Sequence, residues 1–185
     1  ILRWREAERR LTIFIPVGDG NIISGIHKGF KDLQALGWIS TMPRLMGVQS
    51  IGSAAVALTY QHGDEKINPV HADTIADSIS VDLPRDGVRA VRAVRETDGA
   101  YLVVSDAEIL KAIAELGKAG IFAEPAAATA YAGLVKAVEK RQVDPDDFIL
   151  VLSTGNGLKD VDAAMQSVSV APIIDPTLES LRKVL

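Results

Sequence analysis

Short runs of apolar residues alternate along the chain with longer stretches in which apolar side chains recur every three or four positions. Runs rich in β-branched and aromatic residues predict buried strands, and the longer spacing predicts amphipathic helices. The predicted strands cover residues 11–17, 44–49, 100–104, 121–122 and 148–152. The predicted helices cover residues 21–36, 52–60, 87–95, 105–118, 125–140 and 158–165.

Strands that are apolar throughout and alternate with helices favour a parallel sheet covered on both faces. The sequence therefore predicts a three-layer αβα fold of the α/β class with a mostly parallel sheet. We place this α/β domain at residues 11–165. Residues 1–10 are predicted to be a helix end or a frayed segment, and residues 166–185 a weakly structured C-terminal tail. The polar residues 61–75 are expected to form a surface excursion.

Composition narrows the class of protein. The net charge of −4 gives no general attraction for nucleic acid or for an anionic membrane surface. The absence of cysteine excludes disulfides and thiolate metal ligands, and it fits a reducing compartment. Because there is no secretory signal pattern and no apolar run of about 20 residues, a cytoplasmic protein without a membrane span is expected. The first residue is Ile rather than Met, as expected for a processed product or a piece of a longer chain.

A glycine-rich loop, Val17 to Asn21, joins the first predicted strand to the first predicted helix. Ligands of open α/β sheets bind outside the carboxyl ends of strands, and the first N–H groups of a helix have no partner within it. Gly18 and Gly20 permit positive φ and leave room for an anion. Since the loop has neither a Walker lysine nor GxGxxG spacing, we interpret it as a main-chain site for a single phosphate; the alternative is an ordinary turn. Asp19 is expected to point away from the anion or to cap the turn.

A second glycine loop, Ser153 to Gly157, follows the last predicted strand. It also lies at a carboxyl end and is therefore able to face the same cleft. Ser153 and Thr154 carry hydroxyls that suit a hydrogen bond to a ring nitrogen. The alternative is that these hydroxyls cap the next helix.

Six segments carry a resemblance to a known family. They are PVGDGNIISGIHKGF (16–30), MPRLMGVQSIGSAA (42–55), ADTIADSISVDLPRDGVRAVRAV (72–94), GAYLVVSDAEIL (99–110), GIFAEPAAATAYAGL (120–134) and LSTGNGLKD (152–160). Together they resemble threonine synthases, in the tryptophan synthase β-like group (fold type II) of pyridoxal-phosphate enzymes. The resemblance runs from about residue 11 to residue 165.

The resemblance implies pyridoxal 5′-phosphate as the cofactor and assigns roles to individual residues. The residues that match the family's phosphate loop are Gly18, Asp19, Gly20, Asn21 and Ile22. The family pattern there often reads G-N-A-G-N, so Asp19, Asn21 and Ile22 depart from it in side chain. Thr154 matches the hydroxyl residue that bonds the pyridine nitrogen. Glu124 matches a residue near the cofactor, although a glutamate at a helix start beside Pro125 also has a purely structural explanation.

The family's Schiff-base lysine lies in an S-F-K-D type motif that this sequence does not contain. Lys31 falls about ten residues inside the helix after the phosphate loop and is not that lysine. The resemblance therefore implies that the chain corresponds to the C-terminal half to two-thirds of a threonine synthase. It implies cofactor contacts without a catalytic residue, and an isolated chain that is inactive.

For the complete enzyme the resemblance implies a lyase of threonine biosynthesis that converts O-phospho-L-homoserine and water to L-threonine and phosphate. It also implies a homodimer, with no nucleic acid or membrane partner. The alternatives are a non-catalytic paralogue that binds the cofactor or phosphate, and a threonine or serine dehydratase of the same fold. His27 and Lys28 are expected on the helix surface, and the sequence shows no cluster of His and carboxylate residues spaced for a catalytic metal.

Overall fold

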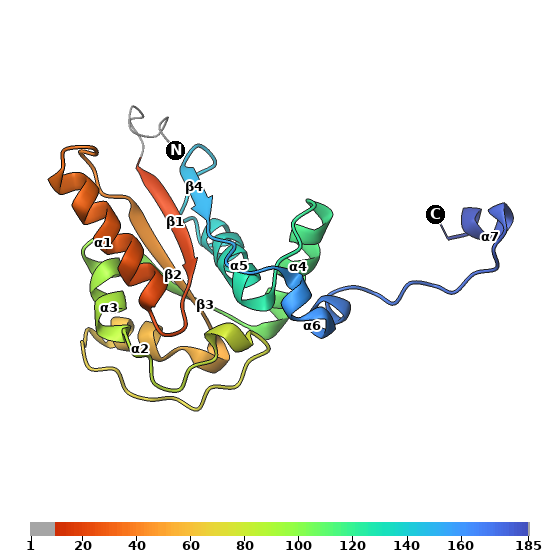
Figure 1. Cartoon of the computed structure of the whole chain (residues 1–185), viewed down its shortest axis with the longest axis horizontal. Helices are drawn as coiled ribbons and strands as arrows, with labels where there is room; N and C mark the ends of the chain where they lie inside the picture. Colours follow the sequence, from red (N-terminus) through yellow and green to blue (C-terminus); the bar gives the residue numbers. More distant parts are fainter. Residues whose placement is uncertain (1–9, 185) are drawn as a thin grey trace.

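A four-stranded sheet lies at the centre of the computed structural model, which describes residues 10–184 (Figure 1). The strands are β1 (Leu11–Pro16), β2 (Arg44–Ser50), β3 (Ala100–Val104) and β4 (Phe148–Val151). Their order across the sheet is β3-β2-β1-β4, and every neighbouring pair is parallel. The predicted N-terminal helix end, apart from Arg10, lies outside the described residues.

Helices cover both faces of this sheet (Figure 1). One face carries α1 (Asn21–Ala35), α2 (Ala55–His62) and α3 (Gly87–Arg95), and the other carries α4 (Asp106–Lys118) and α5 (Pro125–Glu139). Short helices follow at α6 (Val161–Gln166) and α7 (Leu178–Arg182), and the 3-10 turns are Ile51–Ser53, Asp77–Ile79 and Gly157–Lys159. The predicted three-layer α/β architecture is confirmed.

The alternation of side chains along β1 explains why both faces need a cover. Ile13, Ile15 and Val17 point into the core shared with α1, α2 and α3. Phe14, between them, points into the core shared with α4 and α5. A strand whose successive side chains enter opposite cores is apolar throughout, which is the pattern that predicted a parallel sheet.

A capping box opens α4 at Ser105. The Ser105 hydroxyl accepts a hydrogen bond from the Glu108 N–H, and the Glu108 carboxylate accepts one from the Ser105 N–H at 2.6 Å. Burial raises the pKa of Glu108, but its bonds to Ser105 and Lys136 lower that pKa by more. These bonds fix the start of α4.

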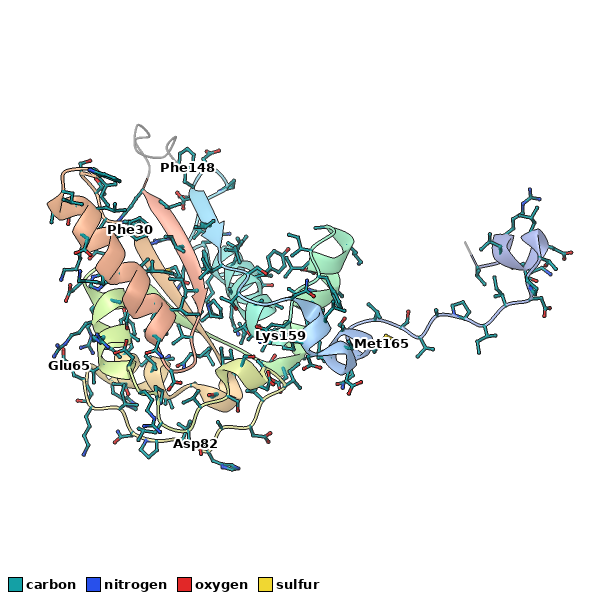
Figure 2. The ribbon with its side chains drawn as sticks, viewed as in Figure 1. Phe30, Glu65, Asp82, Phe148, Lys159 and Met165 are labelled. Carbon is teal, nitrogen blue, oxygen red and sulfur yellow. The ribbon has the colours of Figure 1, made fainter. Side chains whose placement is uncertain are left out.

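Several sequence predictions need correction. Residues 121–122 do not form a strand, because Ala123 makes only an isolated antiparallel bridge to Asn156. The 148–152 segment is a strand but is not buried on both faces, since β4 is at the edge of the sheet and Phe148 is 40% exposed (Figure 2). The helices predicted at 52–60 and 158–165 each begin with a 3-10 turn, so α2 and α6 start three residues later.

The last residues leave the body of the molecule as an extended arm that ends in α7 (Figure 1). Apolar side chains are exposed on this arm and on α6, where Met165 is 59% exposed (Figure 2). Between residues 10 and 184, no helix has the length and apolar character needed to span a bilayer.

Candidate functional site

A cavity lies at the carboxyl end of the sheet, where the loops after β1 and β4 meet. Its volume is about 260 Å³, close to the lower end of the range of roughly 300–1,000 Å³ typical of small-ligand sites. It is lined by Pro16, Gly18, Asp19, Gly20, Asn21, Ile22, Ile23, Ser78, Ile79, Glu124, Ala126 and Thr154. All six residues expected from the sequence to contact a cofactor therefore line one cavity.

The loop after β1 requires glycine at two positions for different reasons. Gly20 has φ of +93°, in the left-handed region that side chains rarely adopt. Gly18 has an ordinary φ, but a Cβ there would lie 2.9 Å from the Cα of Ile79. The sequence had suggested positive φ at both glycines, whereas at Gly18 the requirement is a close approach of two backbones.

The start of α1 presents unpaired main-chain donors to this cavity. Gly20 is the N-cap residue and supplies no side chain, and no described side chain caps the helix. The first intrahelical bond of the loop is donated by the Ser24 N–H to the Gly20 carbonyl at 3.1 Å. The N–H groups of residues 21–23 are therefore available to an anion, with the helix dipole behind them.

Asp19 does not oppose an anion in this cavity. Its carboxylate accepts a hydrogen bond from the Arg85 N–H at 2.9 Å, and its carbonyl accepts one from the Asp86 N–H at 2.9 Å. The carboxylate is thus turned to the neighbouring loop, as expected. None of the residues that line the cavity is Lys or Arg, so its anion-binding capacity rests on the main chain.

Two buried polar side chains hold the cavity wall and were missed in the sequence. The Gln49 side chain donates to the Val17 carbonyl at 3.1 Å and accepts from the Ala57 N–H at 2.8 Å. The Ser53 hydroxyl bonds both the N–H and the carbonyl of Val81, at 2.9 and 3.2 Å, and the carbonyl of Ile79. A polar residue at the end of an otherwise apolar strand was the available signal for Gln49.

Thr154, on the loop after β4, lines the same cavity as the loop after β1. Its side chain is exposed, and no described residue hydrogen-bonds to its hydroxyl. The alternative role, capping the next helix, is performed elsewhere, because Asn156 accepts from the Leu158 N–H and Asp160 accepts from the Ala163 N–H. The Thr154 hydroxyl is therefore left free to bond a ligand.

Glu124 also lines the cavity, and its side chain is only 5% exposed. It is the N-cap residue of α5, where a negative charge is favourable next to the helix N-terminus, and it makes no side-chain capping bond. Its carboxylate instead pairs with the Lys159 ammonium at 2.7 Å and accepts from the Ser78 hydroxyl at 3.5 Å. A Cβ on Gly155 would overlap this carboxylate.

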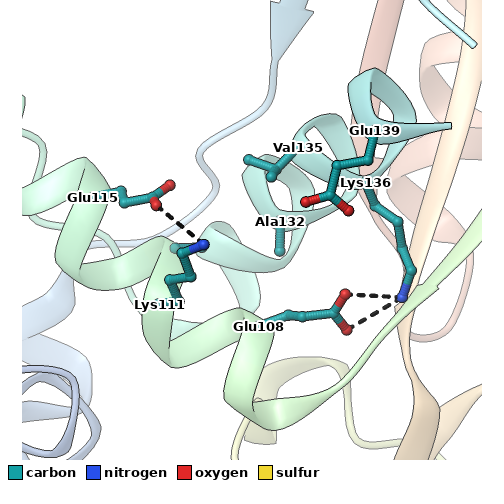
Figure 3. Close-up of a pocket in the computed structure, with 8 residues that line it drawn as sticks. Glu108, Lys111, Glu115, Ala132, Val135, Lys136 and Glu139 are labelled. Atoms are coloured by element: carbon teal, nitrogen blue, oxygen red, sulfur yellow. Dashed lines mark hydrogen bonds and ion pairs between the residues drawn. The ribbon is translucent and has the colours of Figure 1, made fainter. Parts of the chain in front are cut away.

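A second hollow lies between α4 and α5 (Figure 3). Its volume is only about 50 Å³. Two ion pairs line it, with Lys136 3.0 Å from Glu108 and Lys111 3.8 Å from Glu115. The Lys136 ammonium also donates to the Val103 carbonyl at 2.8 Å. These contacts join the two helices to the sheet and leave little space for a ligand.

His27 is not on the helix surface, contrary to the sequence prediction. It is 9% exposed and lies between α1 and α3, with its Nε2 atom 3.3 Å from the Glu96 carboxylate. Burial lowers the pKa of His27, Glu96 raises it and Lys31 lowers it, with a net decrease below 6.5. Burial prevails because Glu96 is half exposed and is shared with Lys31 at 3.1 Å. Lys28, in contrast, is exposed as predicted and pairs with Asp32.

The depressed pKa of His27 predicts a loss of stability in mild acid. Below the unfolded-state pKa of 6.5 the unfolded chain binds a proton that the folded chain resists, so stability falls as pH drops from 7.5 to 5. Thermal melts of the native chain and of His27→Gln over this range should show a smaller decrease for the variant. His62→Gln, in which an exposed histidine is replaced, is the control. Equal pH dependence in all three proteins would contradict this assignment.

Within residues 10–184, no group of three or more His, Asp or Glu side chains is arranged to hold a metal ion. The cavity at the carboxyl end of the sheet is the candidate ligand site of the described residues.

Comparison with known proteins identifies the class to which this fold and cavity belong. Residues 3–155 match the family described as pyridoxal-phosphate dependent enzyme. The chain belongs to this family, whose members depend on pyridoxal phosphate.

The sequence relatives of this chain include threonine synthases. The chain is 34% identical over 186 residues to the threonine synthase of Methanocaldococcus jannaschii, covering 100% of this chain and 45% of the relative. It is 36% identical over 165 residues to the threonine synthase of Mycobacterium bovis, covering 88% of this chain and 44% of the relative. The chain thus spans less than half the length of these relatives.

Solved structures show the same fold at lower identity. Threonine deaminase isoform 2 from Solanum lycopersicum matches with a TM-score of 0.68 and 20% identity, over 90% of this chain and 47% of that one. Threonine synthase from Escherichia coli matches with a TM-score of 0.64 and 21% identity, over 91% and 38%.

The chemistry of the cavity fits a cofactor with a phosphate and an aromatic nitrogen. The cradle after β1 is kept open by glycines whose Cβ atoms would collide with its walls, and the donors that face it are main-chain N–H groups. A free hydroxyl on Thr154 lines the same space. Main-chain N–H groups at a helix start suit an anion, and a neutral hydroxyl suits a ring nitrogen, so both kinds of donor that such a cofactor needs line one cavity.

Proposed function

We propose that the chain is part of a threonine synthase that converts O-phospho-L-homoserine and water to L-threonine and phosphate. In this proposal residues 18–22 bind the phosphate of pyridoxal phosphate and Thr154 bonds its pyridine nitrogen. The observation that carries it is the shared cavity of these two segments, which lie more than 130 residues apart in the sequence yet line one space. The two threonine synthases that match at 34% and 36% identity support the choice of reaction.

The residues have separate tasks in this proposal. The N–H groups of residues 21–23 bind and orient the phosphate, which fixes the ligand at one end. The Thr154 hydroxyl donates to the ring nitrogen and, being neutral, does not hold that nitrogen protonated as a carboxylate would. When bound, the cofactor supplies an electron sink for the carbanion chemistry of an amino-acid substrate.

Two other functions remain alternatives. The dehydratase alternative draws on the threonine deaminase fold, but at 20% identity that likeness shows the fold alone. A non-catalytic paralogue would keep the cavity and lack turnover in any form of the protein. The coding sequence upstream of residue 1 would separate part of a complete enzyme from a non-catalytic paralogue, since it would show whether a cofactor-binding lysine segment accompanies the chain.

Replacement of Thr154 tests the ring-nitrogen contact. In equilibrium dialysis, Thr154→Val should weaken binding of pyridoxal phosphate about five- to tenfold, the worth of one hydrogen bond of roughly 1 kcal/mol. Binding of inorganic phosphate should be unchanged because the loop after β1 is intact. Thr41→Val, at another exposed threonine, is the control and should bind as the native chain does. A native chain that binds neither compound, or a Thr154 variant that binds the cofactor normally, would contradict the proposal.

We expect the 185-residue chain alone to release no phosphate from O-phospho-L-homoserine. No lysine is among the residues that line the cavity, so no amine there can bind the cofactor covalently. Lys159, which contacts the cavity-lining Glu124, is engaged in an ion pair with that carboxylate at 2.7 Å. Steady phosphate release by the pure chain would show that another amine performs this task.

A further inference from the structure

Glu124 presents a difficulty for a cavity that accepts an anion. Its carboxylate is 5% exposed and lies on the cavity wall, where a free negative charge would repel a phosphate-bearing ligand. Lys159 lies 2.7 Å from that carboxylate while its own side chain is 60% exposed. The ammonium therefore remains largely hydrated, and the carboxylate receives the balancing charge.

The Glu124–Lys159 ion pair and two main-chain hydrogen bonds join residues 122–124 to residues 154–159, and together these segments form a short ring at the cavity wall. The Glu124 N–H donates to the Gly155 carbonyl at 3.1 Å, and the Gly157 N–H donates to the Phe122 carbonyl at 3.0 Å. Lys159 ends the 3-10 turn that begins at Gly157, and its ammonium also donates to the Ser78 hydroxyl at 3.3 Å. Residues 154–159 are thus held against residues 122–124, and Thr154 is the first residue of this ring.

Resting on the proposed function, we infer that Lys159 is a positioning residue that holds the Glu124 carboxylate against Gly155 and offsets its charge, so that the cavity accepts an anionic ligand with Thr154 in place. The contact with Glu124 also raises the pKa of Lys159, so the ammonium stays charged throughout the neutral range. Its protonated amine is accordingly a counter-ion and not a nucleophile.

Ligand binding by a double-mutant cycle tests the charge balance. Lys159→Met should weaken binding of pyridoxal phosphate about five- to thirtyfold, because an unpaired carboxylate is left beside the anion. Lys159→Arg should restore binding to within about threefold of the native chain. In the presence of Glu124→Gln, the further change Lys159→Met should have little effect, since the charge to be balanced is gone. Lys111→Met removes another exposed lysine of an ion pair, on α4, and is the control (Figure 3).

Amide hydrogen exchange tests the positioning role without any ligand. In Lys159→Met, the Glu124 and Gly157 N–H groups should exchange about tenfold faster relative to those of β1, and in Lys159→Arg they should exchange at the native rate. Native exchange and native binding in Lys159→Met would overturn the inference. So would additive effects of the Lys159 and Glu124 changes. If the native chain binds no pyridoxal phosphate, the proposed function fails, and the exchange rates alone then decide whether Lys159 positions this ring.

Discussion

Gly20→Ala should lower the free energy of unfolding by about 2–4 kcal/mol and reduce phosphate binding about tenfold or more. The φ of +93° is costly for any side chain, and the new Cβ would lie 2.8 Å from the Cβ of Ala90 and 3.0 Å from the Asp86 carbonyl oxygen. The strain is relieved only if the loop moves away from α3, and such a movement re-aims the N–H groups at the start of α1. Urea denaturation and phosphate titration measure the two effects.

Gly25→Ala, in the same helix, is the matched control. Gly25 is exposed, and a Cβ there meets no atom within 4 Å. Alanine in a helix interior is more favourable than glycine by roughly 0.5–1 kcal/mol, so this variant should be slightly more stable than the native chain and bind phosphate equally well. A Gly20 variant that matched the Gly25 variant in both measurements would show that the left-handed turn is unnecessary.

Gln49→Leu should destabilise the chain by about 2–4 kcal/mol, because it leaves the Val17 carbonyl and the Ala57 N–H buried without their partners. The Gln49 side chain is 1% exposed, so water cannot replace it without opening the core. Since Val17 begins the glycine loop, phosphate affinity should fall as well. Denaturant midpoints at constant m-value would establish the change in stability.

Gln61→Leu, on the exposed end of α2, is the comparison for this variant and should change stability by less than about 0.5 kcal/mol. If the two glutamine replacements had equal effects, the bridge from Gln49 to the loop after β1 would not contribute to stability.

The sequence was sufficient to predict the layers and the principal loops, because these depend on local pattern. Ile13, Phe14 and Ile15 point alternately into two cores. Three consecutive apolar residues in a strand are enough to indicate that both of its faces are buried. The sequence was less informative at the edge of the sheet. The run at Phe148 to Leu152 is as apolar as β1, yet no pattern within it tells that β4 has a single described neighbour.

Contacts between segments that are distant in the sequence could not be predicted either, because the local sequence pattern does not show which segments meet. His27 has helical spacing that is compatible with either face of α1, and its burial depends on the packing of α3 against α1, which also places Glu96 beside His27 and Lys31. The pairing of Glu124 with Lys159 likewise depends on a loop closing over the start of α5. The division of the chain into a 1–10 segment, an 11–165 domain and a 166–185 tail stays a prediction.

The start of α1 has a consequence for how such a site can vary between proteins. Asn21 and Ile22 have exposed side chains, and what this end of the helix offers to the cavity is main-chain N–H. The residue types at positions 21 and 22 can therefore change while the backbone conformation of the loop is kept, provided that glycine remains at positions 18 and 20. In the proposed function, recognition of this kind depends on the shape of the backbone and not on the side chains, so a loop whose residues differ from the family's usual pattern is still able to bind the phosphate.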